Sequence, residues 1–211
     1  MPLGALQKDV APLPGGLPTE PTNVYKQLGP PSPHWVMYYA WDAFEVSRHV
    51  ILDADAAELK AHLSTGMFSS ALPSSDGRQL YVADSMSHGP ARTRRDYISV
   101  YDTNDYSLSR TLDLPKNRRA LMGPISRIAL VDDDRFLVVF NFTPGTGISV
   151  IDMETLSLVS EIETPGCYLT FPTGDRGVSM LCGDGRLLTV HLDAEGALDR
   201  RIISEPFFDP D

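Results

Sequence analysis

The sequence predicts an all-β fold of the β-propeller class. Three features support this prediction: a short phrase of strand character ending in aspartate recurs about every fifty residues, apolar strands flank the copies, and Gly- and Asp-rich turns separate the strands. A single blade cannot bury both of its faces, so neighbouring blades must stack. At this period residues 34–211 accommodate three to four four-stranded blades. We expect the front part of a longer propeller, with a closed four-bladed ring as the alternative.

The first 33 residues differ in composition from the rest. They contain eight of the 17 prolines and four glycines, and their charges cancel, so the net charge of −10 lies on residues 34–211. Such a segment cannot bury enough surface to offset the entropy lost on ordering. We therefore expect a flexible tail over residues 1–33. It lacks the pattern of a secretory signal, which indicates either a cytoplasmic protein or a reading frame without its true signal.

The charge balance and the hydropathy pattern argue against two classes of partner. Eighteen basic residues against 28 acidic ones do not make the clustered positive surface that nucleic acids require. No apolar run approaches the roughly 18 residues of a membrane span. The five histidines show no metal-ligand spacing, so we predict no metal site and expect surface or strand histidines.

The recurring phrase orders the blades along the chain. It occupies residues 50–53, 100–102, 150–152 and 191–193. The aspartates that end the four copies are 49, 50 and 41 residues apart. An apolar strand precedes each copy, at residues 36–40, 80–83, 136–140 and 178–182. A strand with alternating apolar residues follows, as over residues 108–114, and the turns between strands contain Asp-Gly or Asp-rich runs.

One segment carries conflicting signals. Residues 53–63 are rich in Ala, Glu, Leu and Lys and favour a helix by propensity. The alternation of Leu59, Ala61 and Leu63, together with the place of this segment in the repeat, favours a strand. We predict the strand, because the repeat outweighs local propensity.

Alignment of the repeats brings out three motifs. They are Arg-Arg-Asp-Tyr-Ile-Ser-Val-Tyr-Asp at residues 94–102, Gly-Ile-Ser-Val-Ile-Asp at residues 147–152, and the succession Gly-Cys-Tyr, Phe-Pro and Met-Leu-Cys-Gly-Asp-Gly within residues 166–185. With these motifs, residues 35–211 resemble roughly the first half of the heavy subunit of the quinoprotein amine dehydrogenases, which comprise the methylamine and aromatic amine dehydrogenases.

The resemblance implies a seven-bladed heavy subunit without a quinone. In that family a small light subunit carries tryptophan tryptophylquinone, oxidises a primary amine to an aldehyde and ammonia, and passes electrons to a blue copper protein of the amicyanin or azurin type. This chain would be scaffold, channel wall and docking surface in the periplasm, with the catalytic residues on the light subunit. Trp35 and Trp41 would pack in the first blade or at a subunit contact and would not form the quinone.

The two cysteines face each other across a predicted hairpin. With the turn at residues 172–176 and the centre of the hairpin taken between Gly174 and Asp175, Cys167 and Cys182 lie at equal distances from that centre, so an antiparallel register places them directly opposite each other. A disulfide needs only a modest approach from there, although two buried thiols fit the same geometry. The resemblance, in which periplasmic heavy subunits have cysteines at these positions, favours the Cys167–Cys182 disulfide.

The resemblance also implies a channel residue. Counting back from the turn at residues 76–77, the family places a phenylalanine that borders the substrate channel at Met67, and this sequence has Phe68 beside it. We predict Met67 as the channel residue, because a flexible apolar side chain suits an adjustable wall. Phe68 takes its place only if the strand register shifts by one, and ordinary core packing is the alternative for both.

The loop at residues 85–95 is predicted to contact a partner. It is six residues longer than its counterpart in the next repeat, and it carries Arg92, Arg94 and Arg95 on an otherwise acidic chain. Propellers place contacts on such extended loops. Arg94 matches an Arg-x-Asp motif of the family, whereas Arg92 is displaced by one position from the family's earlier arginine. A solvated loop without a partner is the alternative.

Two other functional interpretations stay open at this point. A non-enzymatic propeller that only binds a protein partner would share the fold, because fold does not imply function. A propeller lactonase is a weaker alternative, since the sequence shows no ligand cluster for a metal.

Overall fold

The computed structural model describes residues 26–43, 46–66, 68–88, 93–115 and 127–209, which form fifteen strands in four antiparallel sheets. The first sheet consists of β1 (Trp35–Ala43), β2 (Val46–Asp53) and β3 (Glu58–Thr65). The second consists of β4 (Ser70–Pro73), β5 (Gln79–His88), β6 (Thr93–Asp102) and β7 (Leu108–Asp113). The third consists of β8 (Ile128–Val131), β9 (Phe136–Asn141), β10 (Gly147–Asp152) and β11 (Ser157–Glu163). The fourth consists of β12 (Cys167–Thr173), β13 (Gly177–Cys182), β14 (Leu187–Leu192) and β15 (Leu198–Ile203).

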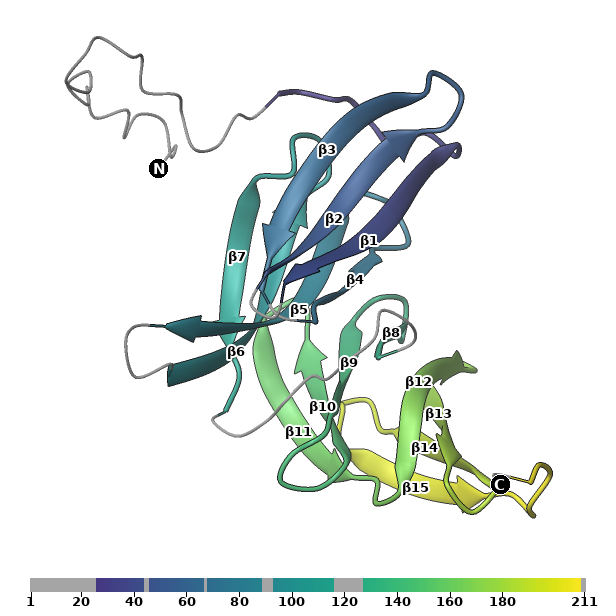
Figure 1. Cartoon of the computed structure of the whole chain (residues 1–211). Coiled ribbons are helices and arrows are strands. Elements are labelled where there is room, and N and C mark those ends of the chain that lie inside the picture. Colours follow the sequence, from purple (N-terminus) through teal and green to yellow (C-terminus); the bar gives the residue numbers. More distant parts are fainter. Residues whose placement is uncertain (1–25, 44–45, 67, 89–92, 116–126, 210–211) are drawn as a thin grey trace, which may run out of the picture.

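Each sheet is one propeller blade, and the blades follow one another along the chain. Within a blade the strands form a meander in sequence order. The first strands of blades 2, 3 and 4 meet, because β8 contacts both β4 and β12. Figure 1 shows β4, β8 and β12 close together, with the last strands β7, β11 and β15 on the far side of their sheets. This is the radial order of propeller blades, with the first strand innermost.

Blade 1 differs from the other blades because its described part contains three strands and not four. The recurring phrase ends β2, β6, β10 and β14, and the last three are the third strands of their blades. β1 and β2 therefore correspond to the second and third strands of a blade. Among the described residues no strand pairs with the free edge of β1. Val36 and Tyr38 on this edge strand are 51% and 57% exposed.

The aspartate of the recurring phrase caps the turn to the last strand of its blade. Asp53, Asp102, Asp152 and Asp193 each accept a hydrogen bond from a backbone N–H two to four residues later. These bonds favour the charged carboxylate, and they are the main reason why the pKa values of Asp53 and Asp152 are lowered. The repeat is therefore a structural signal that ends a strand in a turn.

The core lies between the blades. Blade 3 is covered on both faces, so every residue of β9 and β10 is buried. Alternate residues point to opposite faces: Phe136, Phe140 and Ile148 belong to the cluster shared with blade 4, and Val139 and Ile151 to the cluster shared with blade 2. The outer strand β15, by contrast, is exposed along its whole length.

The predicted all-β propeller fold is confirmed, and residues 53–63 form the end of β2, a turn and the start of β3 rather than a helix. Residues 1–25 of the predicted tail lie outside the described residues. Residues 26–33 form no strand, but the backbone N–H of Leu28 donates to the carbonyl of Asn104 at 2.7 Å. A search of the described ranges finds no helix long and apolar enough to cross a membrane.

Candidate functional site

The segment between β3 and β4 joins blades 1 and 2 and contains the predicted channel residues. Met67 itself lies outside the described residues. The backbone N–H of Gly66 donates to Oδ2 of Asp84 at 2.8 Å. A Cβ atom at Gly66 would lie 2.1 Å from the carbonyl oxygen of Ser85, so only glycine fits there. Phe68 is half-buried and has a φ of 52°, a conformation that costs free energy for a non-glycine residue. It lies in the turn between β3 and β4 and not in a strand, so the predicted choice between Met67 and Phe68 by strand register does not apply.

Asp84 on β5 anchors this segment from blade 2. Its Oδ2 accepts hydrogen bonds from Gly66 N and from the Tyr97 hydroxyl at 3.2 Å, and its Oδ1 accepts one from Ser85 N at 2.7 Å. Burial raises the pKa of Asp84 to about 6, and the carboxylate of Asp96 adds to the rise, against the opposing effect of these hydrogen bonds. The group changes its charge in the weakly acidic range. Because its oxygens are already engaged, the geometry favours a positioning role.

Blade 1 holds the same segment from the other side. The hydroxyl of Ser69 lies 2.8 Å from Nε2 of His49 and 2.6 Å from the hydroxyl of Thr65. Burial lowers the pKa of His49 to about 4, so the imidazole is neutral at neutral pH. His49 is 3% exposed and Ser69 is 0% exposed, so the pair supports the segment and does not meet a substrate.

The predicted loop at residues 85–95 is mostly strand: residues 85–88 end β5 and residues 93–95 begin β6, which pair with each other. The extra length of this repeat therefore extends a hairpin. Its tip at residues 89–92, which includes Arg92, lies outside the described residues. Arg94 donates through Nε and Nη2 to Oδ1 of Asp96 at 2.8 and 2.6 Å, and through Nη2 to the Ser85 hydroxyl at 2.8 Å. Arg95 is half-exposed and donates to both carboxylate oxygens of Asp113 at 2.6 Å. These pairs orient the base of the hairpin, and a partner contact at its tip stays a prediction.

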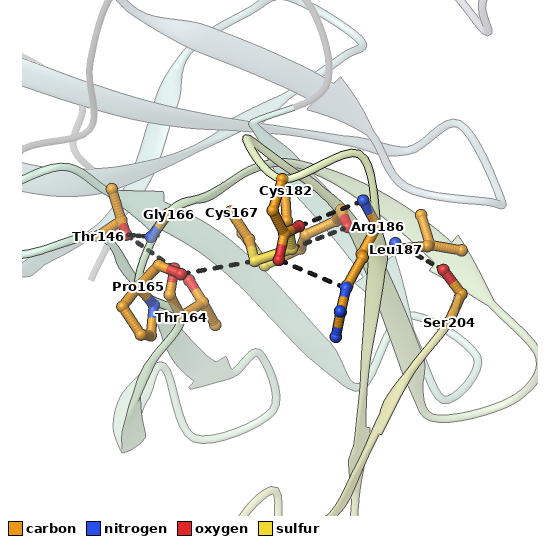
Figure 2. Close-up of a disulfide and its surroundings, with 11 residues drawn as sticks. Thr146, Thr164, Pro165, Gly166, Cys167, Cys182, Arg186, Leu187 and Ser204 are labelled. Atoms are coloured by element: carbon orange, nitrogen blue, oxygen red, sulfur yellow. Dashed lines mark hydrogen bonds and ion pairs between the residues drawn. A yellow bond between two sulfur atoms is a disulfide. The ribbon is translucent and has the colours of Figure 1, made fainter. Parts of the chain in front are cut away.

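A disulfide joins Cys167, at the start of β12, to Cys182, at the end of β13 (Figure 2). The two residues are direct partners in the antiparallel register. Strand β12 is less regular than the sequence suggested. It bulges between Tyr168 and Phe171, and Leu169 has a φ of 67°. The disulfide ties the innermost strand of blade 4 to its neighbour.

These features share one end of the blades. In a meander of antiparallel strands, the start of the first strand and the hairpin between the second and third strands lie at the same end. Gly66, Asp84 and the disulfide all occupy this end, whereas the capped Asp turns occupy the other. In the described part of the chain, no group of three or more His, Cys, Asp or Glu side chains is placed to hold a metal.

The sequence alone did not single out Asp84 or the contact between His49 and Ser69. Asp84 directly follows the apolar run at residues 80–83, and a carboxylate that continues a buried strand was the available signal. His49 and Ser69 gave no such signal, because they are 20 residues apart and meet only through the fold.

Comparisons with known proteins place the chain in a family. The family profile described as methylamine dehydrogenase heavy chain matches residues 37–211. The methylamine dehydrogenase heavy chain of Methylophilus methylotrophus is 31% identical over 147 residues, which cover 69% of this chain and 36% of that protein. The heavy chain of Methylobacillus flagellatus is 29% identical over 190 residues, which cover 87% of this chain and 47% of that protein. The chain thus spans less than half the length of these relatives.

Solved structures agree on the architecture. The structure of the dihydro-heme d1 dehydrogenase NirN is 22% identical with a TM-score of 0.56 and covers 90% of this chain and 38% of its own. TolB from Acinetobacter baumannii is 15% identical with a TM-score of 0.51, over 82% of this chain and 41% of its own. At such identities these two structures support the fold alone. The profile match extends over four stacked blades and includes both cysteines, and this chain therefore belongs to the methylamine dehydrogenase heavy chain family.

Proposed function

We propose that this chain is part of the heavy subunit of a quinoprotein amine dehydrogenase. In that role it supports the oxidative deamination of a primary amine to an aldehyde and ammonia. The observation that carries the proposal is the family match over residues 37–211 on a partial propeller. By the same resemblance we propose a periplasmic location, a ring of seven blades and a blue copper protein of the amicyanin or azurin type as electron acceptor.

The cofactor of this proposal, tryptophan tryptophylquinone, belongs on a light subunit, where it would accept electrons from the amine. The one tryptophan of this chain whose side chain is described fits a packing role. The indole N–H of Trp35 donates to Oδ2 of Asp53 at 3.1 Å, and Nζ of Lys60 lies 5.3 Å from the centre of its ring. Trp35 is thus engaged within blade 1, and the side chain of Trp41 lies outside the described residues.

The contribution of this chain to the reaction would be a rigid wall beside the path of the amine. On the N-terminal side of this wall Gly66 is held by Asp84, and on its C-terminal side Ser69 is held by the Thr65 hydroxyl and by His49. A wall held in this way keeps its shape when a substrate binds, which favours discrimination between amines by size. The role of Met67 and Phe68 in that wall is part of the proposal.

Co-purification tests the proposed function. The chain, with an affinity tag, is co-expressed in the periplasm with a Cys-rich light subunit, and the eluate is assayed for quinone absorbance and for dye-linked oxidation of methylamine. We expect the quinone-bearing subunit to elute with this chain. A chain that shows the circular dichroism of a folded β-protein and yet never retains a quinone-bearing partner would instead support the non-enzymatic scaffold.

A further inference from the structure

A cavity of about 400 Å³ lies where the innermost strands of blades 2, 3 and 4 meet. Its walls are largely apolar, and Leu72, Leu130 and Phe171 contribute to them. The polar residues that line the same cavity are Ser70, Ser75, Arg127, Asp134 and Thr170. The Asp134 carboxylate is engaged by Ser75, whose hydroxyl donates to its Oδ1 at 2.8 Å. Ser70 begins β4, and Arg127 directly precedes β8. A concave apolar site with a few polar groups is the usual form of a small-molecule pocket.

Arg127 is buried, and four of the five N–H donors of its guanidinium are unpaired. The residue is 1% exposed, and its Nε donates to the hydroxyl of Tyr168 at 3.1 Å. Its terminal nitrogens, Nη1 and Nη2, are buried and have no hydrogen-bond partner among the described residues. The backbone is fixed as well, because the carbonyl of Arg127 accepts a hydrogen bond from Phe140 N at 2.8 Å.

Ser70 is the second orphan donor of the cavity. Its side chain is buried, with 4% of the residue exposed, and its Oγ also lacks a partner in the described part of the chain. Buried polar groups are nearly always paired, so two unpaired groups on one cavity indicate a missing binding partner. Since Nη1, Nη2 and Oγ can all donate, that partner must accept hydrogen bonds.

The charge of Arg127 defines the chemistry of this partner. Burial lowers the pKa of the guanidinium, but an arginine stays protonated in a protein. A buried cation without a counter-charge is costly. Nη1 and Nη2 together form the planar fork that binds the two oxygens of a carboxylate. The same positive charge repels a protonated amine, so the ligand of this cavity differs in charge from the amine of the proposed function.

We propose that Arg127 and Ser70 bind the carboxylate of a small organic acid whose short apolar body lies between the innermost strands. Nη1 and Nη2 of Arg127 would each donate to one carboxylate oxygen, and the Ser70 hydroxyl would donate to one of the same oxygens. Leu72, Leu130 and Phe171 would contact the apolar body. This inference does not rest on the amine dehydrogenase proposal.

Butyrate is the probe, and butylammonium, which has the same apolar body and the opposite charge, is its control. The thermal midpoint of the full chain is measured in chloride buffer of constant ionic strength, and butyrate affinity is measured by titration of ¹⁵N-arginine guanidinium signals. We expect butyrate, and not butylammonium, to raise the midpoint of the wild type and to shift one guanidinium signal. Loss of the fork in Arg127→Met should weaken butyrate binding by about tenfold to hundredfold.

The variants separate a binding role from a structural one. Without butyrate, Arg127→Met should have a higher midpoint than the wild type, because an apolar side chain of similar length removes an unpaired buried charge. Arg176→Met, which removes a partly exposed arginine paired with Asp132 at 3.6 Å, should keep the response to butyrate. Should Arg127→Met fail to fold, Arg127→Lys keeps the charge without the fork and should still weaken binding.

Equal shifts with butyrate and butylammonium would overturn the proposal. A wild-type chain that does not respond to butyrate would also overturn it. Nη1 and Nη2 of Arg127 would then be the binding partners of an acidic side chain from another polypeptide segment. An Arg127→Met chain with a lowered midpoint and an unchanged affinity for butyrate would show that Arg127 is purely structural.

Discussion

Replacement of Asp84 by asparagine should remove a pH dependence of the free energy of unfolding whose sign is opposite to that of ordinary acid denaturation. Burial raises the pKa of Asp84 from 3.8 to about 6. Since the folded-state pKa is the higher one, the folded chain binds the proton more tightly than the unfolded chain. The stability from this group is fully present below about pH 4 and is lost as the pH rises through about 6. Two pKa units at roughly 1.4 kcal/mol each amount to about 3 kcal/mol.

Urea unfolding at pH 4, 5, 6 and 7.5, followed by circular dichroism, measures this contribution. Asparagine does not titrate. The free energy of unfolding of Asp84→Asn, taken relative to that of the wild type, should therefore rise by about 3 kcal/mol between pH 4 and pH 7.5. The amide offers fewer acceptors to Gly66 N, Ser85 N and the Tyr97 hydroxyl. The stability lost with these hydrogen bonds does not depend on pH. It therefore shifts the free-energy difference between Asp84→Asn and the wild type by the same amount at every pH.

His49→Gln provides a control of opposite sign. Burial lowers the pKa of His49 from 6.5 to about 4, so its contribution is present above about pH 6.5 and is lost as the pH falls through about 4. The wild type should lose about 3 kcal/mol relative to His49→Gln on acidification over this range. Parallel stability curves for the wild type and Asp84→Asn would refute the argument that Asp84 is a desolvated anchor of the Gly66–Phe68 segment.

Four further predictions concern the Gly66 contact, the disulfide, the proposed channel residues and the uncovered strand edges. Gly66→Ala should lower the free energy of unfolding by roughly 1–3 kcal/mol in urea, because its Cβ would collide with a backbone carbonyl; unchanged stability would contradict the observed packing. The double variant Cys167→Ser, Cys182→Ser should lose about 3 kcal/mol, and denatured, unreduced wild type should titrate no free thiol; two free thiols would end the prediction. In a reconstituted complex, Met67→Ala should change relative kcat/KM between small aliphatic and bulky aromatic amines by about 10- to 200-fold, while Phe68→Ala mainly lowers stability; reversed behaviour would make Phe68 the channel residue. The isolated chain should self-associate at micromolar concentration in sedimentation velocity, because the free edge of β1 and the outer strand β15 are uncovered; a monomer that unfolds cooperatively would count against this.

The sequence by itself determined the blades, because their signals are local. Alternation with period two, strand phrases ending in aspartate and Asp-Gly turns depend on residues that are neighbours along the chain. The aspartate caps its own turn through backbone N–H groups two to four residues away, so the repeat marks each blade directly. One hairpin also connects Cys167 and Cys182, but their direct pairing depends on the bulge in β12. Thr173 pairs with Gly177 next to the turn, and that register without the bulge would place Cys167 opposite Gly183.

The tertiary structure decided what the local signals do not contain. The innermost strands β4 and β8 have four residues each, which is too short for a period to be recognised. Only the strand order showed that β1 and β2 take the places of the second and third strands of a blade. The hydrogen bonds between Asp84 and Gly66 and between His49 and Ser69 connect blade 1 with blade 2. The unpaired guanidinium nitrogens of Arg127 are likewise visible only in the folded chain. Burial and pairing of a polar group depend on what packs against it from elsewhere in the chain, and no pattern among its sequence neighbours encodes that packing.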